Sequence, residues 1–283
     1  MNEQIIKLIG QAIQEDLGAG DITTRSTVDS NTMARGRIIT KESGVIAGLP
    51  VAKEVFRQVD RRIKFAPGVR EGAKVRKGKV IAVVSGSARG ILTGERVALN
   101  FLQRLSGVAT LTHQFVSRAG PRVEILDTRK TTPGLRALEK YAVRVGGGTN
   151  HRMGLYDAIL IKDNHIALAG GVEKAIKKAK GPSTLLGASK RQKAKGIEVE
   201  AKTIPQVKQA IKAGADKILL DNMNVKALRK AIKFCKKARV WTEASGGVNL
   251  KTVRKIARTG VNAISVGALT HSPKALDISL KIV

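Results

Sequence analysis

Charged and polar side chains follow six short apolar runs in the second half of the sequence, at the points where those runs end. They are Asp127, Thr128, Arg129 and Lys130, then Lys162, Asp163 and His165, then Glu198 and Glu200, then Asp221 and Asn222, then Glu243 and Ser245, and finally Gly267. One Lys or Asp after a strand is more often a cap or a solvated loop residue than a functional group. Six successive runs that end in this way indicate a functional site.

The cations of this region match a substrate with several anionic groups. They are Arg129, Lys130, His151, Arg152 and Lys162, with Arg96 upstream. A planar guanidinium binds a carboxylate or phosphate through two parallel hydrogen bonds, whereas an ammonium acts as a point charge. Two carboxylates and a pyrophosphate would suit this set.

Two carboxylates could hold a metal ion beside those cations. Glu200 and Asp221 end neighbouring predicted strands. Mg²⁺ usually binds through one or two carboxylates together with substrate phosphates, so the pair predicts Mg²⁺ bridging a pyrophosphate. Glu198 lies two residues before Glu200 and therefore points to the same side of its strand, where it either assists or pairs with a lysine.

Two glycine-containing loops predict a phosphate site. They are EASGGVN at 243–249 and ISVGALTHS at 264–272, and both follow predicted strands. Gly246 and Gly247 have no side chain to keep their backbone amides from a phosphate, and a helix expected to start near Asn249 would add its positive end. The SGG motif alone is also a plain turn, but loops after the last two strands of a barrel often bind phosphate together.

The glycine run GGGTNHR at 146–152 allows two interpretations. It could be a flexible linker with His151 as a structural histidine, which is the commoner role. It lies between DTRK and ILIKDNH, so it could equally be a loop that folds over the anion with His151 and Arg152.

The elements that must position these groups form a βα pattern from about Val123 onward. The runs VEILDT, DAILIK, GIEVEA, KILLD, VWTEA and AISVG predict buried parallel strands, and stretches such as IPQVKQAIKAGA and LKTVRKIARTG predict helices between them. The last four runs start about 20 to 24 residues apart, close to the minimum for a βα unit. This favours an incomplete βα, TIM-like barrel over a doubly wound sheet, because no strand precedes a GxGxxG turn.

The first part of the chain has a different pattern. Gly and Pro separate short mixed runs, which predicts a small α+β domain, and the stretch from Gly94 to Ala119 predicts a long connecting helix that could break at Gly107. We therefore expect an N-terminal α+β domain with its connecting helix at 1–110 and a catalytic barrel at 111–283. The last residues could pack back on the first domain.

Composition limits the function classes. The net charge of +30 favours an anionic partner, but aromatic residues make up 3% and the Lys and Arg are spread along the chain, which makes nucleic acid an unlikely partner. Cys235 is the only cysteine, so no internal disulfide can form and a reducing compartment fits. The acidic residues in the amphipathic first 18 residues and the lack of a long apolar run predict a cytoplasmic protein with no membrane span.

Nearly the whole chain resembles the quinolinate phosphoribosyltransferase family. The resemblance rests on EDLGAGDITT at 15–24, ESGVIAG at 42–48, LTGERVALNFLQRLSGVAT at 92–110, the block from ILDTRKTTPG through GGGTNHR to ILIKDNH at 125–165, KAGADKILLDNM at 212–223 and the SGG and VGALTHS loops. Family members often have Ser where this chain has Ala244, a difference that leaves the backbone amides of the loop in place.

The resemblance implies a fold, an assembly and a reaction. The fold is a small N-terminal α/β domain with an incomplete barrel of about seven strands, in a homodimer or larger homo-oligomer, and Arg96 reaches the site of a partner subunit. The reaction is phosphoribosyl transfer from phosphoribosyl pyrophosphate to quinolinate with decarboxylation, which gives nicotinate mononucleotide, pyrophosphate and carbon dioxide in NAD biosynthesis.

The resemblance also assigns the two substrates to residues. Quinolinate would lie among Arg96, Arg129, Lys130, His151, Arg152 and Lys162. Phosphoribosyl pyrophosphate with Mg²⁺ would be held by Lys130, Lys162, Glu200 and Asp221, and its 5′-phosphate by Ser245, Gly246, Gly247, Ala268, Leu269 and Thr270. A diverged relative associated with molybdenum uptake and a nucleic-acid-binding protein on the same scaffold are the alternatives, and the complete cationic set argues against the first.

Overall fold

The computed structural model describes residues 2–181 and 196–283, which form two compact units. The first unit comprises residues 1–113, 131–147 and 269–283, and the second comprises residues 114–130 and 148–268. The chain therefore passes between the units several times.

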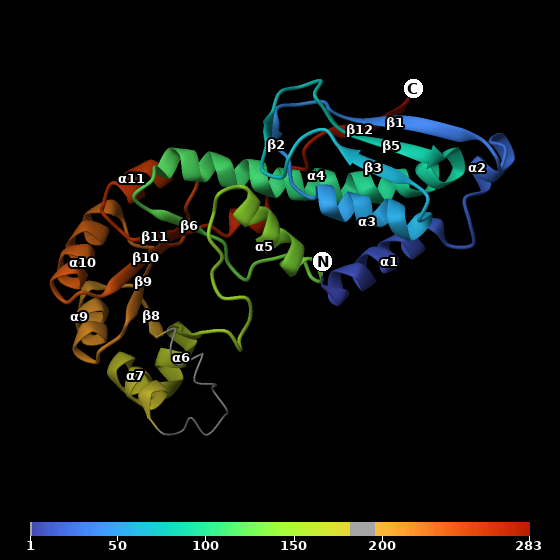
Figure 1. The fold of residues 1–283 in the computed structure, drawn as a ribbon. Helices are drawn as coiled ribbons and strands as arrows, with labels where there is room; N and C mark the ends of the chain where they lie inside the picture. The colour runs from blue at the N-terminus through green and yellow to red at the C-terminus, as the bar shows by residue number, and fades with distance from the viewer. Residues whose placement is uncertain (1, 182–195) are drawn as a thin grey trace. The chain divides into compact units, whose positions relative to one another are not determined.

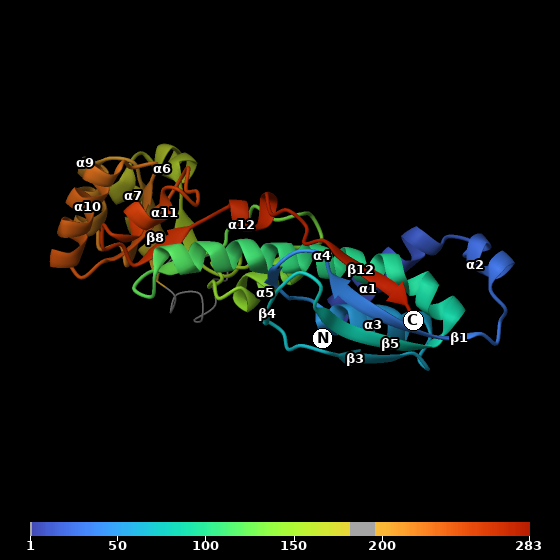
Figure 2. The ribbon, with the colours of Figure 1, turned by 90° about the horizontal axis from the view of Figure 1, so that it is seen from above.

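The first unit is an antiparallel sheet with helices. Its sheet has the strand order β12-β1-β5-β3, and Figure 1 shows α3 and α1 stacked below it. The elements are α1 (Glu3–Leu17), α2 (Ile22–Thr27), β1 (Met33–Thr40), β2 (Gly44–Val45), α3 (Leu49–Val59), β3 (Lys64–Pro67), β4 (Lys74–Val75), β5 (Val80–Ser87), most of α4 (Ala88–Ala119), α5 (Arg136–Val145), the last residues of α12 (Ala268–His271) and β12 (Ile278–Ile282). The C-terminal strand thus completes the sheet of the N-terminal unit, and Figure 2 shows β12 beside β1.

Helix α4 runs without interruption through Gly107, so the break that the glycine allowed does not occur. A side chain at Gly107 would overlap with the backbone carbonyl of Lys274. The glycine therefore permits a close approach of the 274–275 backbone instead of ending the helix. Within the described residues, no helix combines the length and apolarity needed to cross a membrane.

The second unit is a parallel sheet with helices on its outer side, as the βα pattern predicts. The sheet has the strand order β6-β11-β10-β9-β8-β7, and Figure 1 shows α7, α9, α10 and α11 outside the strands. The elements are β6 (Glu124–Leu126), β7 (Ile159–Ile161), α6 (Asp163–Ala169), α7 (Val172–Lys180), β8 (Ile197–Ala201), α9 (Ile204–Lys212), β9 (Lys217–Asp221), α10 (Val225–Lys237), β10 (Trp241–Ser245), α11 (Val253–Ala257) and β11 (Ala263–Ser265). All six predicted strands are confirmed.

The sheet is an incomplete barrel, because β6 and β7 are its two edges. Six strands form among the described residues, where the resemblance implied about seven. Thr149 makes a single parallel bridge to Leu126 of β6. From this bridge, residues 150–158 lead as a loop to β7.

The middles of the strands form the core, and the site lies at their ends. Ile218 and Leu220 of β9 are fully buried, whereas Asp221 at the end of the strand is partly exposed. Burying an aliphatic side chain of this size contributes about 1.5–3 kcal/mol. The apolar residues thus hold the sheet against its helices and leave the strand ends to carry polar groups.

Candidate active site

The second unit brings most of the predicted site residues to one edge of its sheet. Carboxyl ends of parallel strands meet at the same edge, which is where βα barrels place their reactive groups. The residues are Thr128, Arg129 and Lys130 after β6, Lys162 after β7, Glu200 in β8, Asp221 at the end of β9, and Ser245, Gly246 and Gly247 at and after the end of β10.

Two guanidinium groups converge at this edge. Burial lowers the pKa of Arg152, and the nearby positive charge of Arg129 lowers it further. The Nη1 atom of Arg152 donates a hydrogen bond to the carbonyl of Ala158 at 3.1 Å, which fixes its direction. Like charges held together in a partly buried place favour an anion between them, so this pair is suited to a carboxylate.

Two carboxylates converge on the neighbouring strands. Glu200 is buried, and its pKa is raised first by that burial and then by the negative charges of Asp221 and Asp163. Repulsion between carboxylates is relieved by a cation, so Glu200 and Asp221 fit the carboxylate and phosphate coordination that Mg²⁺ adopts.

Lys202 is a site residue that the sequence interpretation missed. Its Nζ atom lies 2.7 Å from Oδ2 of Asp163 and 3.6 Å from Oε1 of Glu200. Its position directly after the run GIEVEA was the available signal, because that is a strand end like the others. Lys202 partly balances the acidic pair and adds a further cation beside it.

The SGG loop has the close approach that its glycines predict. Gly246 has a φ of 96°, and a side chain there would overlap with the amide side chain of Asn222. Asn222 itself has a φ of 53° and donates its backbone N–H to the carbonyl of Ser245 at 2.8 Å. The loops after β9 and β10 are therefore packed together, and only glycine fits at position 246.

The helix after this loop begins later than expected. It starts at Val253, not near Asn249. The side chain of Asn249 accepts hydrogen bonds from the backbone N–H groups of Lys251 and Thr252, which forms a local turn before the helix. The expectation that the helix starts near Asn249 was wrong for this reason.

Three predicted residues, Arg96, Leu269 and Thr270, belong to the first unit. Arg96 is an exposed residue of α4. Leu269 and Thr270 of α12 are fully buried, and the carbonyl of Thr270 accepts a hydrogen bond from the guanidinium of Arg104.

Arg104 organises a buried network that the sequence did not indicate. Its guanidinium also donates to the carboxylate of Glu139 and to the hydroxyl of Thr132. Glu139 is fully buried and accepts the backbone N–H of Thr132 at 3.0 Å. The network therefore ties residues 131–134 (TTPG) and residues 269–271 (LTH) to helices α4 and α5 of the first unit.

The loop that crosses the barrel opening is held by an acidic residue at its base. The carboxylate of Asp127, fully buried at the end of β6, accepts the backbone N–H of His151 at 2.9 Å and the side-chain amide of Asn150 at 2.6 Å. Asp127 thus fixes the start of the loop that carries His151 and Arg152.

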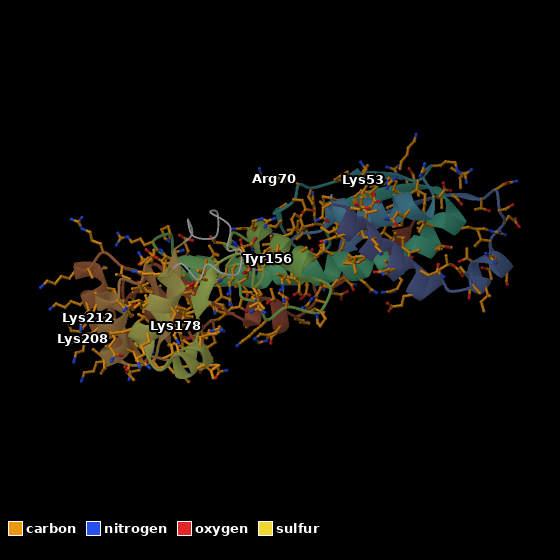
Figure 3. The ribbon with its side chains drawn as sticks, turned by 90° about the horizontal axis from the view of Figure 1, so that it is seen from below. Lys53, Arg70, Tyr156, Lys178, Lys208 and Lys212 are labelled. Atoms are coloured by element: carbon orange, nitrogen blue, oxygen red, sulfur yellow. The ribbon has the colours of Figure 1, made fainter. Side chains whose placement is uncertain are left out.

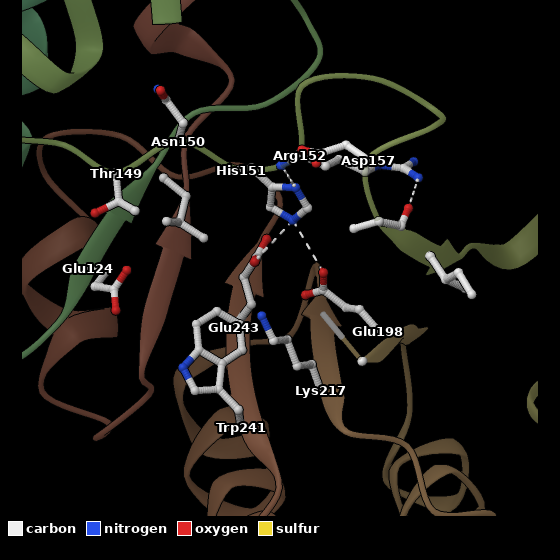
Figure 4. A pocket seen from close by; sticks show the side chains of 14 residues that line it. Glu124, Thr149, Asn150, His151, Arg152, Asp157, Glu198, Lys217, Trp241 and Glu243 are labelled. Carbon is white, nitrogen blue, oxygen red and sulfur yellow. Dashed lines mark hydrogen bonds and ion pairs between the residues drawn. The ribbon is translucent and has the colours of Figure 1, made fainter. Parts of the chain in front are cut away.

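The imidazole of His151 points into the barrel between two acids. Its Nε2 atom lies 3.3 Å from Oε2 of Glu198 and 3.3 Å from Oε2 of Glu243 (Figure 4). Glu243 also accepts a hydrogen bond from the hydroxyl of Ser265. Of the two interpretations of His151, this geometry favours the structural one, and Glu198 pairs with a histidine where a lysine was considered.

The side chains of His151 and Glu243 share one proton. Burial alone would lower the pKa of His151, but the hydrogen bonds that its ring donates to Glu198 and Glu243 raise it to about 9. The Nδ1 atom lies 2.7 Å from the backbone N of Arg152, and burial raises the pKa of Glu243. The pair is neutral overall with the proton on either group.

The trio also has the composition of a metal site, since its ligand atoms lie within 4.8 Å of one another. The tautomer argues against that use. With Nδ1 accepting from Arg152, the ring proton is on Nε2, which then has no lone pair to offer a metal. We therefore interpret the trio as a support for the Arg152 loop.

A cavity of about 490 Å³ lies beside the trio. Its walls include Glu124, Lys217 and Trp241, which begin β6, β9 and β10, so it extends toward the amino ends of the strands (Figure 4). Of the polar groups that the sequence singled out, His151, Arg152, Glu198 and Glu243 line it. Arg152 therefore borders both this cavity and the guanidinium pair, whereas Glu200 and Asp221 do not line the cavity.

Two family models match the chain almost end to end. The model described as quinolinate phosphoribosyl transferase, N-terminal domain, matches residues 21–106, and the one described as quinolinate phosphoribosyl transferase, C-terminal domain, matches residues 108–281.

Individual relatives give the same result. The chain is 45% identical over 280 residues to a probable carboxylating nicotinate-nucleotide pyrophosphorylase of Bacillus subtilis, covering 99% of this chain and 93% of the relative. It is 45% identical over 296 residues to a mitochondrial decarboxylating quinolinate phosphoribosyltransferase 2b of Nicotiana tabacum, covering 99% of this chain and 82% of the relative. The solved structure of NadC from Streptococcus pyogenes is similar with a TM-score of 0.92 and 39% identity, covering 99% of this chain and 96% of that one.

Proposed function

The chain belongs to the quinolinate phosphoribosyltransferase family, and we propose that it transfers the phosphoribosyl group of phosphoribosyl pyrophosphate to quinolinate with loss of carbon dioxide. The products are nicotinate mononucleotide, pyrophosphate and carbon dioxide, for NAD biosynthesis. The observation that carries this proposal is the pairing of two converging guanidinium groups, Arg129 and Arg152, with two converging carboxylates on neighbouring strands. Such a site suits a dicarboxylate next to a magnesium-bound pyrophosphate.

The cations bind and orient quinolinate. Arg129 and Arg152 pair with its carboxylates, and Lys130 and Lys162 add point charges. His151 acts mainly through its neighbour, because its ring is held by Glu198 and Glu243 and accepts the backbone N–H of Arg152. With both carboxylates fixed, the ring nitrogen is directed at the anomeric carbon of the second substrate.

Phosphoribosyl pyrophosphate lies across the carboxyl ends of β8, β9 and β10. Lys130, Lys162, Glu200 and Asp221 hold its pyrophosphate end, and Ser245, Gly246, Gly247, Ala268, Leu269 and Thr270 hold its 5′-phosphate. The positive φ of Gly246 and its contact with Asn222 support the use of backbone amides there.

Glu200 and Asp221 would hold Mg²⁺ together with the phosphates, and the ion would neutralise charge on the departing pyrophosphate. The protein's own share is to keep the reactants together and to place Lys130 and Lys162 near the leaving group. The nitrogen–carbon bond forms as the carbon–oxygen bond to pyrophosphate breaks. The cationic ring then accepts the electron pair of the broken carbon–carboxylate bond, and a proton from solvent replaces the carbon dioxide. No general base is assigned.

Arg96 completes the quinolinate site of a partner subunit in a homodimer or larger homo-oligomer. Its exposure on α4 supports this assignment. Mixing Arg96→Ala subunits with Asp221→Asn subunits tests it, because a site built from two chains regains one intact copy in the mixed assembly. Partial recovery of activity is expected, and the absence of recovery in assemblies shown to be mixed would contradict it.

We place the enzyme in the cytoplasm, which suits its single buried cysteine, Cys235. The plant relative named above is described as mitochondrial, so compartments differ within the family.

Product analysis tests the reaction directly. Purified protein with quinolinate, phosphoribosyl pyrophosphate and Mg²⁺ should give nicotinate mononucleotide and carbon dioxide in equal amounts. Nicotinate in place of quinolinate is the matched control, and it should give no nucleotide, since it lacks the second carboxylate. Absence of both products with quinolinate would refute the proposal and favour the relative associated with molybdenum uptake.

A further inference from the structure

The proposed reaction leaves the large positive charge unexplained, and the structure shows where part of it gathers. The C-terminal ends of α7, α9, α10 and α11 carry exposed cations, which we call the basic rim: Lys177, Lys178, Lys180, Lys212, Lys236, Lys237, Arg239 and Arg258. Figure 3 shows Lys178, Lys208 and Lys212 projecting from the outer helices of this unit.

The rim is continuous from one helix end to the next. The Nζ atom of Lys180, at the end of α7, donates to the carbonyl of Ala213 after α9 at 3.1 Å. The Nζ atom of Lys236, near the end of α10, lies close to Gly260 in the turn after α11. Helix α10 packs against both α9 and α11. Cations that are scattered in the sequence are therefore assembled on one face by folding.

Few acids balance the rim. Among the described residues from 172 to 260, the exposed acids are Glu173 and Asp216. The Oε1 atom of Glu173 lies 3.9 Å from the Nζ atom of Lys212, and both side chains are largely exposed. An exposed ion pair of this kind contributes little to stability. The helix dipole favours cations at helix C-termini, and the last turns of α7 and α10 carry several each.

The rim does not belong to the substrate site. Helices in a βα unit run opposite to their strands, so helix C-termini lie at the amino ends of the strands. Glu200, Asp221 and Ser245 lie at or near the carboxyl ends. The rim thus faces away from the substrates and is available to another polyanion.

We propose that the basic rim binds the phosphodiester backbone of a nucleic-acid duplex without sequence preference. A polymer with closely spaced phosphates matches a continuous row of exposed cations. Single strands are disfavoured, because the rings of Phe234 and Trp241 are covered by Lys208 and Lys217 at 4.9 and 4.8 Å and offer no free stacking surface. A membrane is disfavoured, because the exposed large apolar side chains of this unit, Leu155, Tyr156 and Leu168, lie outside the rim helices.

Binding of labelled duplexes, followed by fluorescence anisotropy over a range of salt, tests the proposal. Duplex DNA and duplex RNA should both bind with dissociation constants of about 1–100 μM at physiological salt, as for non-specific contacts. The rim variant combines Lys178→Glu, Lys212→Glu, Lys236→Glu and Lys237→Glu. It should lower the slope of log affinity against log salt by about 4 and keep wild-type turnover.

The matched control reverses four exposed cations of the first unit: Lys53→Glu, Arg61→Glu, Lys64→Glu and Lys77→Glu. It changes the net charge equally and should leave the slope unchanged. Equal losses in the two variants would show that net charge alone acts and would overturn the proposal, as would a wild type that binds no duplex or prefers anionic phospholipid vesicles. If the rim variant loses turnover, the same four positions changed to Gln repeat the test with less perturbation, and an unaltered slope there also overturns it.

Discussion

The Nε2 atom of His151 lies 3.3 Å from the Oε2 atom of Glu243, whose side chain is 1% exposed. A buried acid on the middle of a strand thereby holds the loop that closes the barrel opening. Because the amide of Arg152 donates to the same ring, the contact couples the barrel interior to the guanidinium that we assign to quinolinate.

Glu243→Gln should therefore impair quinolinate binding more than folding. The substitution keeps the shape but removes the charge that holds the imidazole, so we expect KM for quinolinate to rise about tenfold, with a loss of about 1–3 kcal/mol in stability. Steady-state kinetics with each substrate varied in turn measures this. A merely structural residue would change both KM values and kcat alike.

The shared proton predicts a pH dependence of stability. The pKa of His151 is about 9 in the folded state against an ordinary value of 6.5. This raised pKa contributes up to about 3 kcal/mol to the free energy of unfolding. The contribution is fully present below about pH 6.5 and is lost as the pH rises through 9. Urea unfolding of wild type and Glu243→Gln at both ends of this window checks it. Identical pH profiles would contradict the proton-sharing interpretation.

Gly246→Ala should be far more damaging than Gly247→Ala. Both residues have positive φ, but an added carbon at 246 overlaps with Asn222, whereas at 247 it meets nothing within 4 Å. We expect KM for phosphoribosyl pyrophosphate to rise by about tenfold or more in the first variant relative to the second, since 1.4 kcal/mol corresponds to that factor. Similar values for both would show that backbone strain alone matters there.

Glu200→Gln and Asp221→Asn should shift the magnesium dependence of the reaction. Each removes one of two carboxylates that repel each other, so the ion loses a ligand and half-maximal activity should require about tenfold more Mg²⁺. Titrating activity with Mg²⁺ measures the shift. Lys208→Gln, on the outer helix α9, is the control and should leave the curve unchanged.

The sequence predicted the strands and their polar ends because both are local. The run KILLD has a short apolar centre, and Asp221 is the polar residue that ends it. The partner of His151 could not be predicted in this way. It depends on a loop crossing the barrel opening to reach acids about 47 and 92 residues away, and no local pattern encodes that path.

Close packing explains the other differences. Gly107 looks like a helix break by propensity, but the carbonyl of Lys274 needs its space. Arg104 resembles any helical arginine until Glu139 and Thr270 are brought to it. Contacts between residues far apart in the sequence determine the roles of Gly107 and Arg104. Such contacts cannot be predicted from local sequence patterns.

Titration calorimetry with quinolinate tests the central claim most directly, namely that the guanidinium groups of Arg129 and Arg152 together hold a dicarboxylate. Wild type should release heat with one site per subunit, and Arg129→Ala should bind at least about a hundredfold more weakly while unfolding at the wild-type denaturant midpoint. No heat with wild type at any magnesium concentration, or equal affinity in a folded Arg129→Ala protein, would contradict the account.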